Sequence, residues 1–183
     1  METRQKEIRV TIKGTTPLLF NRFRDASIEG KSKRKAGAEI DLDIKDKLYL
    51  TEDKKAYIPS RYFERAMTIG GQAFKGKGRG NLSTIIGSML SIEPDAIILN
   101  NQNWKEDIQA GVNPMTRGRT MIHRPRFDKW GGKMFIKLDI DEIPTVKLKE
   151  MLDYVGLYVG IGDWRPAKKG KYGKFIVSKF KEI

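Results

Sequence analysis

The sequence predicts an α+β fold in which helices cover one face of an antiparallel sheet. Residues 7–13 and 133–140 alternate between apolar and polar side chains, the period of a strand with one buried face. Residues 61–73 and 146–155 repeat apolar side chains at helical spacing. A further strand-like segment, 175–180, follows the second helix, so a strand–helix–strand order is expected in both halves of the chain.

Shorter elements precede the first helix. The first strand is broken at Gly14, and the apolar residues 18–20 are expected to return to the core. Residues 48–50 and 56–58 predict a short hairpin, because charged turn residues separate two apolar runs. Ser60 then follows a proline and is expected to be the N-cap of the first helix.

The elements after the first helix are also short until the second half begins. Residues 81–90 predict a short helix and residues 96–99 a brief strand, whereas residues 100–107 are polar and are expected at the surface. Gly156 is expected to end the second helix, and the apolar residues 157–161 are interpreted as a strand.

This order of elements fits a ferredoxin-like, RRM-like sheet, which leaves the face without helices open. The length of 183 residues fits a single domain, 1–183. Residues 21–47 have few apolar side chains and are interpreted as a basic loop insertion. Residues 100–126 are interpreted as a second insertion or an edge region.

The charge of the chain indicates a polyanionic partner. Lys and Arg total 36 against 23 Asp and Glu, giving a net charge of +13, and RNA, DNA or an acidic membrane face would match it. The absence of cysteine excludes disulfides and thiolate metal sites, and a single histidine argues against a zinc site or a histidine-based triad. No apolar run approaches the roughly 20 residues of a membrane span, and the N-terminus has no apolar signal core, so a cytoplasmic protein is expected.

Basic residues concentrate in loops and at one helix start, where they could meet phosphates. Long basic loops such as 21–47 often become ordered on a polyanion, although a solvated loop is the alternative. Residues 75–80 alternate glycine with basic residues but lack the ending of a Walker loop. Residues 111–126 are the densest arginine cluster, and arginine binds two phosphate oxygens at once. The candidate contacts are Arg22, Arg24, Lys33, Arg34, Ser60, Arg61, Arg65, Lys75, Lys77, Arg79, Arg117, Arg119, His123, Arg124, Arg126, Trp164, Arg165, Lys168, Lys169 and Lys171.

The stretch from 155 to 175 combines glycines, lysines and aromatic side chains, the components of a nucleic-acid contact surface. The alternative is a solvated basic hairpin with one buried tryptophan. Trp164 therefore has two interpretations: its ring stacks on a base, or it is a core residue.

Four segments of the chain read GTTPLLFNRF, YIPSRYFERAM, VGLYVGIGDWRP and KYGKF. In this order they resemble the RAMP superfamily of CRISPR proteins, in particular the backbone subunits that polymerise along guide RNA. A phage-encoded or stand-alone relative would carry the same pattern. The matching positions are Gly14, Thr16, Pro17 and Leu18, then Ile58, Pro59, Ser60 and Arg61, and finally Gly160, Gly162, Tyr172, Gly173, Lys174 and Phe175.

The resemblance implies a modified RRM in which residues 21–47 form a thumb-like or finger-like insertion. It implies sequence-independent contacts to the RNA backbone, with guide RNA, other copies of the chain and other effector subunits as partners, and with no metal or small-molecule cofactor. Some members cleave RNA with a loop aspartate, for which Asp25, Asp41 and Asp43 are candidates, and a related branch uses a histidine, for which His123 is the candidate. An endoribonuclease is therefore the alternative function, although the acidic cluster of a metal-dependent nuclease is missing. A protein that binds single-stranded DNA or an acidic protein is a weaker alternative.

Overall fold

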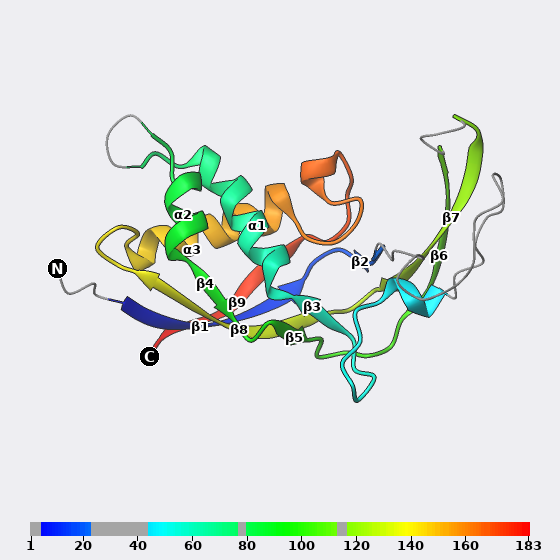
Figure 1. Ribbon diagram of the computed structural model, residues 1–183, viewed down its shortest axis with the longest axis horizontal. Coiled ribbons are helices and arrows are strands. Elements are labelled where there is room, and N and C mark those ends of the chain that lie inside the picture. Colours follow the sequence, from blue (N-terminus) through cyan, green and yellow to red (C-terminus); the bar gives the residue numbers. More distant parts are fainter. Residues whose placement is uncertain (1–4, 23–43, 77–79, 113–116) are drawn as a thin grey trace, which may run out of the picture.

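The computed structural model describes residues 5–22, 44–76, 80–112 and 117–183. Its centre is a four-stranded antiparallel sheet in the order β4-β8-β1-β9 (Figure 1). The strands are β1 (Gln5–Gly14), β4 (Ser91–Glu93), β8 (Gly131–Asp139) and β9 (Phe175–Glu182). The antiparallel sheet predicted from the sequence is confirmed.

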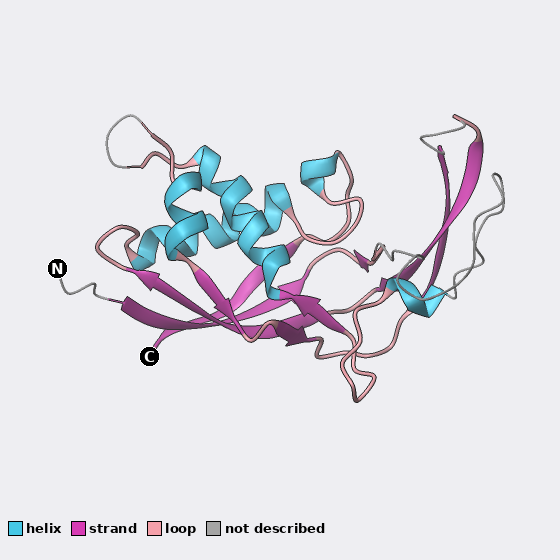
Figure 2. Ribbon diagram, in the orientation of Figure 1, coloured by secondary structure: helices cyan, strands magenta, loops and turns pink. Residues whose placement is uncertain are grey.

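Three helices lie on one face of this sheet: α1 (Ser60–Gly70), α2 (Ser83–Met89) and α3 (Thr145–Tyr154) (Figure 2). The strands β1 and β4 both pair antiparallel with β8, so they are parallel to each other and connected through α1. In the same way β8 and β9 flank β1 and are connected through α3. These two split strand–helix–strand units make the fold ferredoxin-like.

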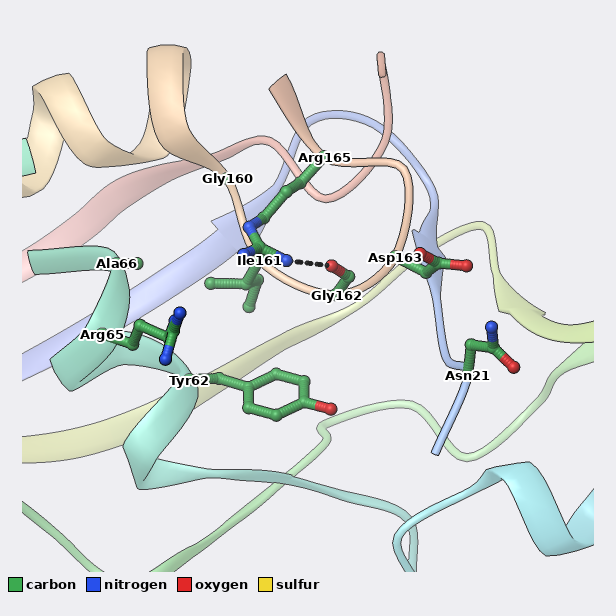
Figure 3. A pocket seen from close by; sticks show the side chains of 9 residues that line it. All are labelled: Asn21, Tyr62, Arg65, Ala66, Gly160, Ile161, Gly162, Asp163 and Arg165. Atoms are coloured by element: carbon green, nitrogen blue, oxygen red, sulfur yellow. Dashed lines mark hydrogen bonds between the residues drawn. The ribbon is translucent and has the colours of Figure 1, made fainter. Parts of the chain in front are cut away.

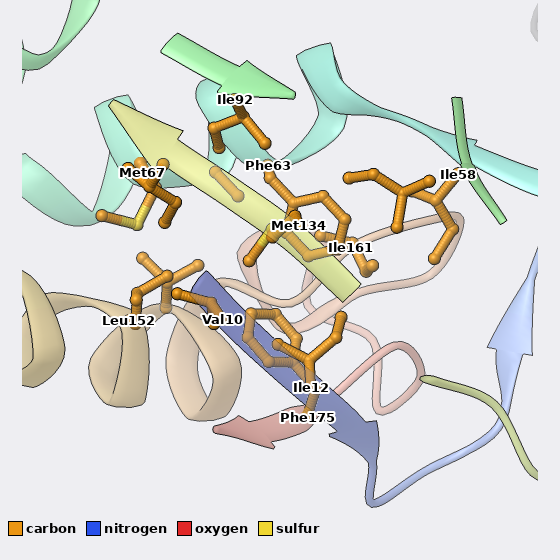
Figure 4. Packing of buried hydrophobic residues seen from close by; sticks show 14 of the residues in the cluster. Val10, Ile12, Ile58, Phe63, Met67, Ile92, Met134, Leu152, Ile161 and Phe175 are labelled. Carbon is orange, nitrogen blue, oxygen red and sulfur yellow. The ribbon is translucent and has the colours of Figure 1, made fainter. Parts of the chain in front are cut away.

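The core lies between the sheet and the helices, as the alternation in the strands predicts. Val10 and Met134 are cross-strand neighbours on β1 and β8, and both are fully buried. They meet Phe63 and Met67 from α1 and Leu152 from α3 (Figure 4). Burying each side chain of this size contributes roughly 1.5–3 kcal/mol, so this layer is the main source of stability.

Two smaller sheets extend the structure beyond the core. The strand β3 (Tyr57–Pro59) pairs with β5 (Ala96–Ile98), and β2 (Leu18–Leu19) pairs with β7 (Arg119–Phe127). The strand β6 (Lys105–Val112) pairs with β7 along its whole length, and this β6–β7 hairpin projects away from the helices (Figure 1). The expected pairing of residues 48–50 with 56–58 is reduced to one bridge, Leu50 with Ala56.

The apolar residues after α3 form a helical turn, so the strand expected at 157–161 is wrong. Residues Val155–Val159 continue α3 as a π-helical turn, in which Val155 and Val159 are buried while Leu157 is half exposed. The i, i+4 spacing of the two valines suits a helix packed on the core. Gly156 is therefore inside the helical segment, and Gly160, with φ of 65°, ends it.

Ser60 is not the N-cap of α1, contrary to expectation. Pro59 occupies that position, and the Ser60 N–H donates to the carbonyl of Asp95 at 2.8 Å. The pairing of β3 with β5 brings that carbonyl to the helix start, which a local sequence pattern does not reveal. Among the described residues, the structure contains no helix long and apolar enough to cross a membrane.

Candidate nucleic-acid interface

A glycine-rich loop, residues 160–173, follows the π-helical turn and is held tightly against two other segments. Gly162 has a φ of 78°, and a Cβ there would lie 2.6 Å from the Leu19 carbonyl oxygen. That same oxygen accepts a hydrogen bond from the Asp163 N–H at 2.9 Å. Gly173 has a φ of 69°, and its Cβ would lie 1.7 Å from the Ile161 oxygen. Glycine is needed at both positions because the backbones approach each other closely.

This loop and helix α1 enclose a pocket of about 220 Å³. Tyr62 and Arg65 line it from α1, and Arg165 lines it from the loop (Figure 3). The Arg165 Nη1 donates to the Gly162 carbonyl at 3.0 Å, which fixes the guanidinium at the pocket edge. Asn21, just after β2, completes the rim.

The pocket is positively charged because its only acidic side chain is already paired. The Asp163 carboxylate forms an ion pair with Arg124, whereas no ion pair within the described part of the chain engages Arg65. Two guanidinium groups therefore face a small polar hollow, and guanidinium groups bind phosphate oxygens in pairs. The arrangement can hold a phosphodiester.

Next to the pocket, two arginines lie over the ring of Tyr49. The guanidinium carbons of Arg22 and Arg61 are 5.2 Å and 5.8 Å from the ring centroid. The Tyr62 hydroxyl donates to the Tyr49 hydroxyl at 3.0 Å, and burial raises the pKa of Tyr62 well above its ordinary value. A hydrogen bond to Tyr49 raises the pKa of Arg61. Tyr62 links this cluster to the pocket, so the cationic surface runs from Arg165 to Arg22.

Where the β6–β7 hairpin joins the body, the arginines predicted as phosphate contacts are already partnered. Arg124 is 2% exposed, with its Nε 2.6 Å from the Asp163 Oδ2 in an ion pair that lacks hydrogen-bond alignment. The ring of Trp164 covers its guanidinium at 4.4 Å. Arg126 pairs with Asp107 and Asp128. Arg124 is therefore buried away from any phosphate, and the partly exposed Arg126 is already engaged by two carboxylates.

Trp164 packs mainly on the protein. Its ring stacks on Tyr172, with ring centroids 6.4 Å apart and an interplanar angle of 29°, and lies 4.4 Å from the Arg124 guanidinium. The residue has a positive φ of 48°, which the tight turn after Gly162 imposes. Of the two interpretations of Trp164, this packing favours the structural one.

The remaining predicted contacts are spread over the molecule. Arg117 and Arg119 are exposed on the hairpin, and His123 lies there with its Nδ1 2.5 Å from Glu106. Lys75 lies at the far end of the helical layer, where the Lys147 ammonium donates to its carbonyl. The lysines within the glycine-rich loop, Lys168, Lys169 and Lys171, are exposed, and the Lys171 ammonium lies 5.7 Å from the centroid of the Tyr172 ring.

Several predicted residues lie outside the described part of the chain: Arg24, Asp25, Lys33, Arg34, Asp41, Asp43, Lys77 and Arg79. Among the described residues, no group of three or more histidine or acidic side chains could hold a metal ion.

Sequence reasoning missed three residues of this surface, namely Asn21, Tyr49 and Tyr62. Tyr49 belonged to a predicted hairpin and Tyr62 to the apolar spacing of a helix, so both were interpreted as packing residues. Only the fold shows that Tyr62 lines the pocket beside the glycine-rich loop and that its hydroxyl donates to Tyr49.

Comparison with known proteins identifies the fold. The structure resembles a chain from the cryo-EM structure of the Type III-B Cmr-beta bound to cognate target RNA, with a TM-score of 0.62 and 12% sequence identity. The similarity covers 98% of this chain and 61% of that chain. No protein-family model and no curated protein matches the sequence.

Proposed function

We propose that this protein is a RAMP-type RNA-binding subunit of a CRISPR ribonucleoprotein, and that it contacts the phosphate backbone of guide RNA independently of sequence. The observation that carries the proposal is the pocket between α1 and the glycine-rich loop, into which Arg65 and Arg165 point (Figure 3). The similarity in fold to a Type III-B Cmr-beta chain whose structure includes target RNA supports it.

The chemistry of the pocket favours phosphate over bases as the recognised group. Two of its five polar side chains are guanidinium groups, which have five donors and no acceptor, and the one carboxylate is already paired with Arg124. Reading a base edge by sequence requires matched donors and acceptors, whereas any phosphate accepts from a guanidinium. The adjacent pair of Arg22 and Arg61 extends the same chemistry along the surface.

The β6–β7 hairpin supports assembly with other copies or other subunits. Ile108, Val112 and Met121 are each at least half exposed on one face of this two-stranded hairpin. An isolated two-stranded hairpin is only marginally stable in water. A partner that buries the exposed apolar side chains would therefore stabilise this hairpin. Light scattering of the protein with and without bound RNA measures the number of copies.

Binding of labelled single-stranded RNA tests the pocket. The variant Arg65→Ala/Arg165→Ala is expected to weaken binding equally for unrelated sequences and to lower the salt slope, d log K/d log[salt], by about 0.7 for each lost phosphate contact. The matched control Lys54→Ala/Lys55→Ala removes the same charge from an exposed turn. Equal losses in both variants would show that only net charge matters and would refute the pocket.

The same samples decide between a binding protein and the alternative endoribonuclease. Labelled RNA is incubated with the protein with and without Mg²⁺, and intact RNA in both is the expected result. Cleavage that requires Mg²⁺ would indicate the loop aspartates, and cleavage without it, lost in His123→Ala, would indicate His123. Equal affinity for single-stranded DNA would instead favour a general single-strand binder.

A further inference from the structure

The face of the four-stranded sheet away from the helices carries a second set of basic residues. The helices lie on one side only, and Figure 2 shows no helix on the other side. In β1, Val10 is fully buried under the helices, whereas the adjacent Arg9 and the later Lys13 are exposed. Because successive side chains alternate between the two faces of a strand, Arg9, Thr11 and Lys13 point to the uncovered face.

The register of the sheet sets these side chains in rows across the strands. Thr11 lies opposite Lys133 of β8 on one side and Lys179 of β9 on the other. One row along, Arg9 lies opposite Phe135 and Lys181. Neighbouring strands are about 4.8 Å apart and two residues along a strand span about 6.7 Å, so these cations form a compact patch.

The acidic residues of the same face border the patch, with Glu93 opposite Phe135 and Glu7 one row from Arg9, and both are engaged by Lys137. The Lys137 Nζ forms an ion pair with the Glu93 carboxylate at 2.9 Å and lies 3.9 Å from the Glu7 carboxylate. Within the described residues, no ion pair engages Lys13, Lys133, Lys179 or Lys181. Uncompensated cations at this spacing attract a polyanion.

A groove and an aromatic ring accompany the charge. The groove has a volume of about 560 Å³ and is lined by Thr11, Lys13, Asn100, Asn101, Lys129 and Ser178, together with Ile12, Gly14 and Trp130. It opens where β9 has a register shift opposite Thr11. The half-buried Phe135 ring lies at the β8 edge of the patch, between Arg9 and Glu93, with the Arg9 guanidinium 5.4 Å from its centroid.

We propose that this uncovered sheet face is a second binding site, which takes a single-stranded nucleic-acid segment. Lys133, Lys179 and Lys13 would contact successive phosphates, and Phe135 would supply a stacking surface for a base. Stacking on an aromatic ring beside a basic track is how single strands are bound without sequence preference. The site is separated by the whole sheet from the pocket between α1 and the glycine-rich loop, so the two faces can hold different segments.

Photo-crosslinking to an RNA of about 12 nucleotides containing 4-thiouridine tests this site in the full chain, at a length within the range of one small single-strand site. Mass spectrometry is expected to find two crosslinked regions, a β8 peptide with Phe135 and an α1 peptide with Tyr62. Lys133→Gln/Lys179→Gln is expected to remove the β8 crosslink, keep the α1 crosslink and lower the salt slope by about 1.4, which corresponds to two phosphate contacts.

Each outcome separates this site from the pocket. Arg65→Ala/Arg165→Ala is expected to remove only the α1 crosslink, and Lys54→Gln/Lys55→Gln neither. Absence of the β8 crosslink in the wild type, with the α1 crosslink present, would overturn the second site and leave the pocket standing. The second site would also be overturned if Lys133→Gln/Lys179→Gln melts as the wild type does and leaves the salt slope of RNA binding unchanged. Capture of phosphatidylserine vesicles by this face with no β8 crosslink to RNA would overturn it as well.

Discussion

Arg124 and Asp163 join the base of the β6–β7 hairpin to the glycine-rich loop through an ion pair of 2.6 Å. Asp163 also donates its N–H to the Leu19 carbonyl in β2, the strand that pairs with β7. The loop that lines the pocket and the hairpin that projects from the body are therefore positioned by the same residue. Three segments far apart in sequence depend on this contact.

Removing one partner of this ion pair is expected to destabilise the protein. Asp163→Asn leaves the 2%-exposed Arg124 guanidinium as an uncompensated buried charge, and breaking a buried pair in this way costs about 3–5 kcal/mol. Because the Asp163 carboxylate is partly exposed and can be solvated, the lower end of that range is expected for Arg124→Ala. Urea unfolding of both single variants and the double variant measures the coupling. Strictly additive losses would show that the two side chains stabilise the fold independently.

Trp164→Ala is expected to lower stability more than it lowers RNA affinity. The ring covers the Arg124 guanidinium and stacks on Tyr172, and truncating a packed tryptophan costs about 3–5 kcal/mol. Melting temperature and RNA affinity are measured on the same samples, with Trp164→Phe as a conservative control that retains an aromatic ring. A normal melting temperature with binding reduced by on the order of 1–3 kcal/mol would instead identify Trp164 as a stacking platform.

Gly173→Ala is expected to destabilise the glycine-rich loop, because the added Cβ would lie 1.7 Å from the Ile161 carbonyl oxygen at a positive φ. Gly87→Ala is the matched control. Gly87 lies in α2, where an added Cβ has no neighbour within 4 Å, and alanine there is expected to stabilise the helix by about 0.5–1 kcal/mol. Thermal unfolding should therefore shift in opposite directions. A Gly173→Ala variant as stable as the wild type would contradict the close approach seen here.

The elements that the sequence predicted well are those whose signal is local. The alternation around Val10 and Met134 identified two central strands because each strand has one buried face. The segment after α3 was misjudged because a short apolar run fits a strand or a buried helix equally well, and packing of Val155 and Val159 on the core decided it.

The candidate site was only partly predictable because arginines with the same sequence signal have different surroundings. Arg124 is buried against Asp163, which lies 39 positions along the chain, whereas Arg119 in the same cluster is exposed. Charge density alone could not separate them. Arg65 and Arg165 likewise line the same pocket only because of how helix α1 and the glycine-rich loop are packed.

The buried Tyr62 hydroxyl gives the folded state a characteristic dependence on alkaline pH. Burial and the hydrogen bond to Tyr49 raise the pKa of Tyr62, so the folded state retains a proton that the unfolded chain loses near pH 10. The contribution of this group is full below that pH, and the free energy of unfolding falls as the pH rises above about 10. Thermal unfolding of the wild type and Tyr62→Phe between about pH 8 and pH 11.5 measures it, and the wild type should lose stability more steeply. Parallel curves for the two proteins would contradict a raised pKa for this hydroxyl.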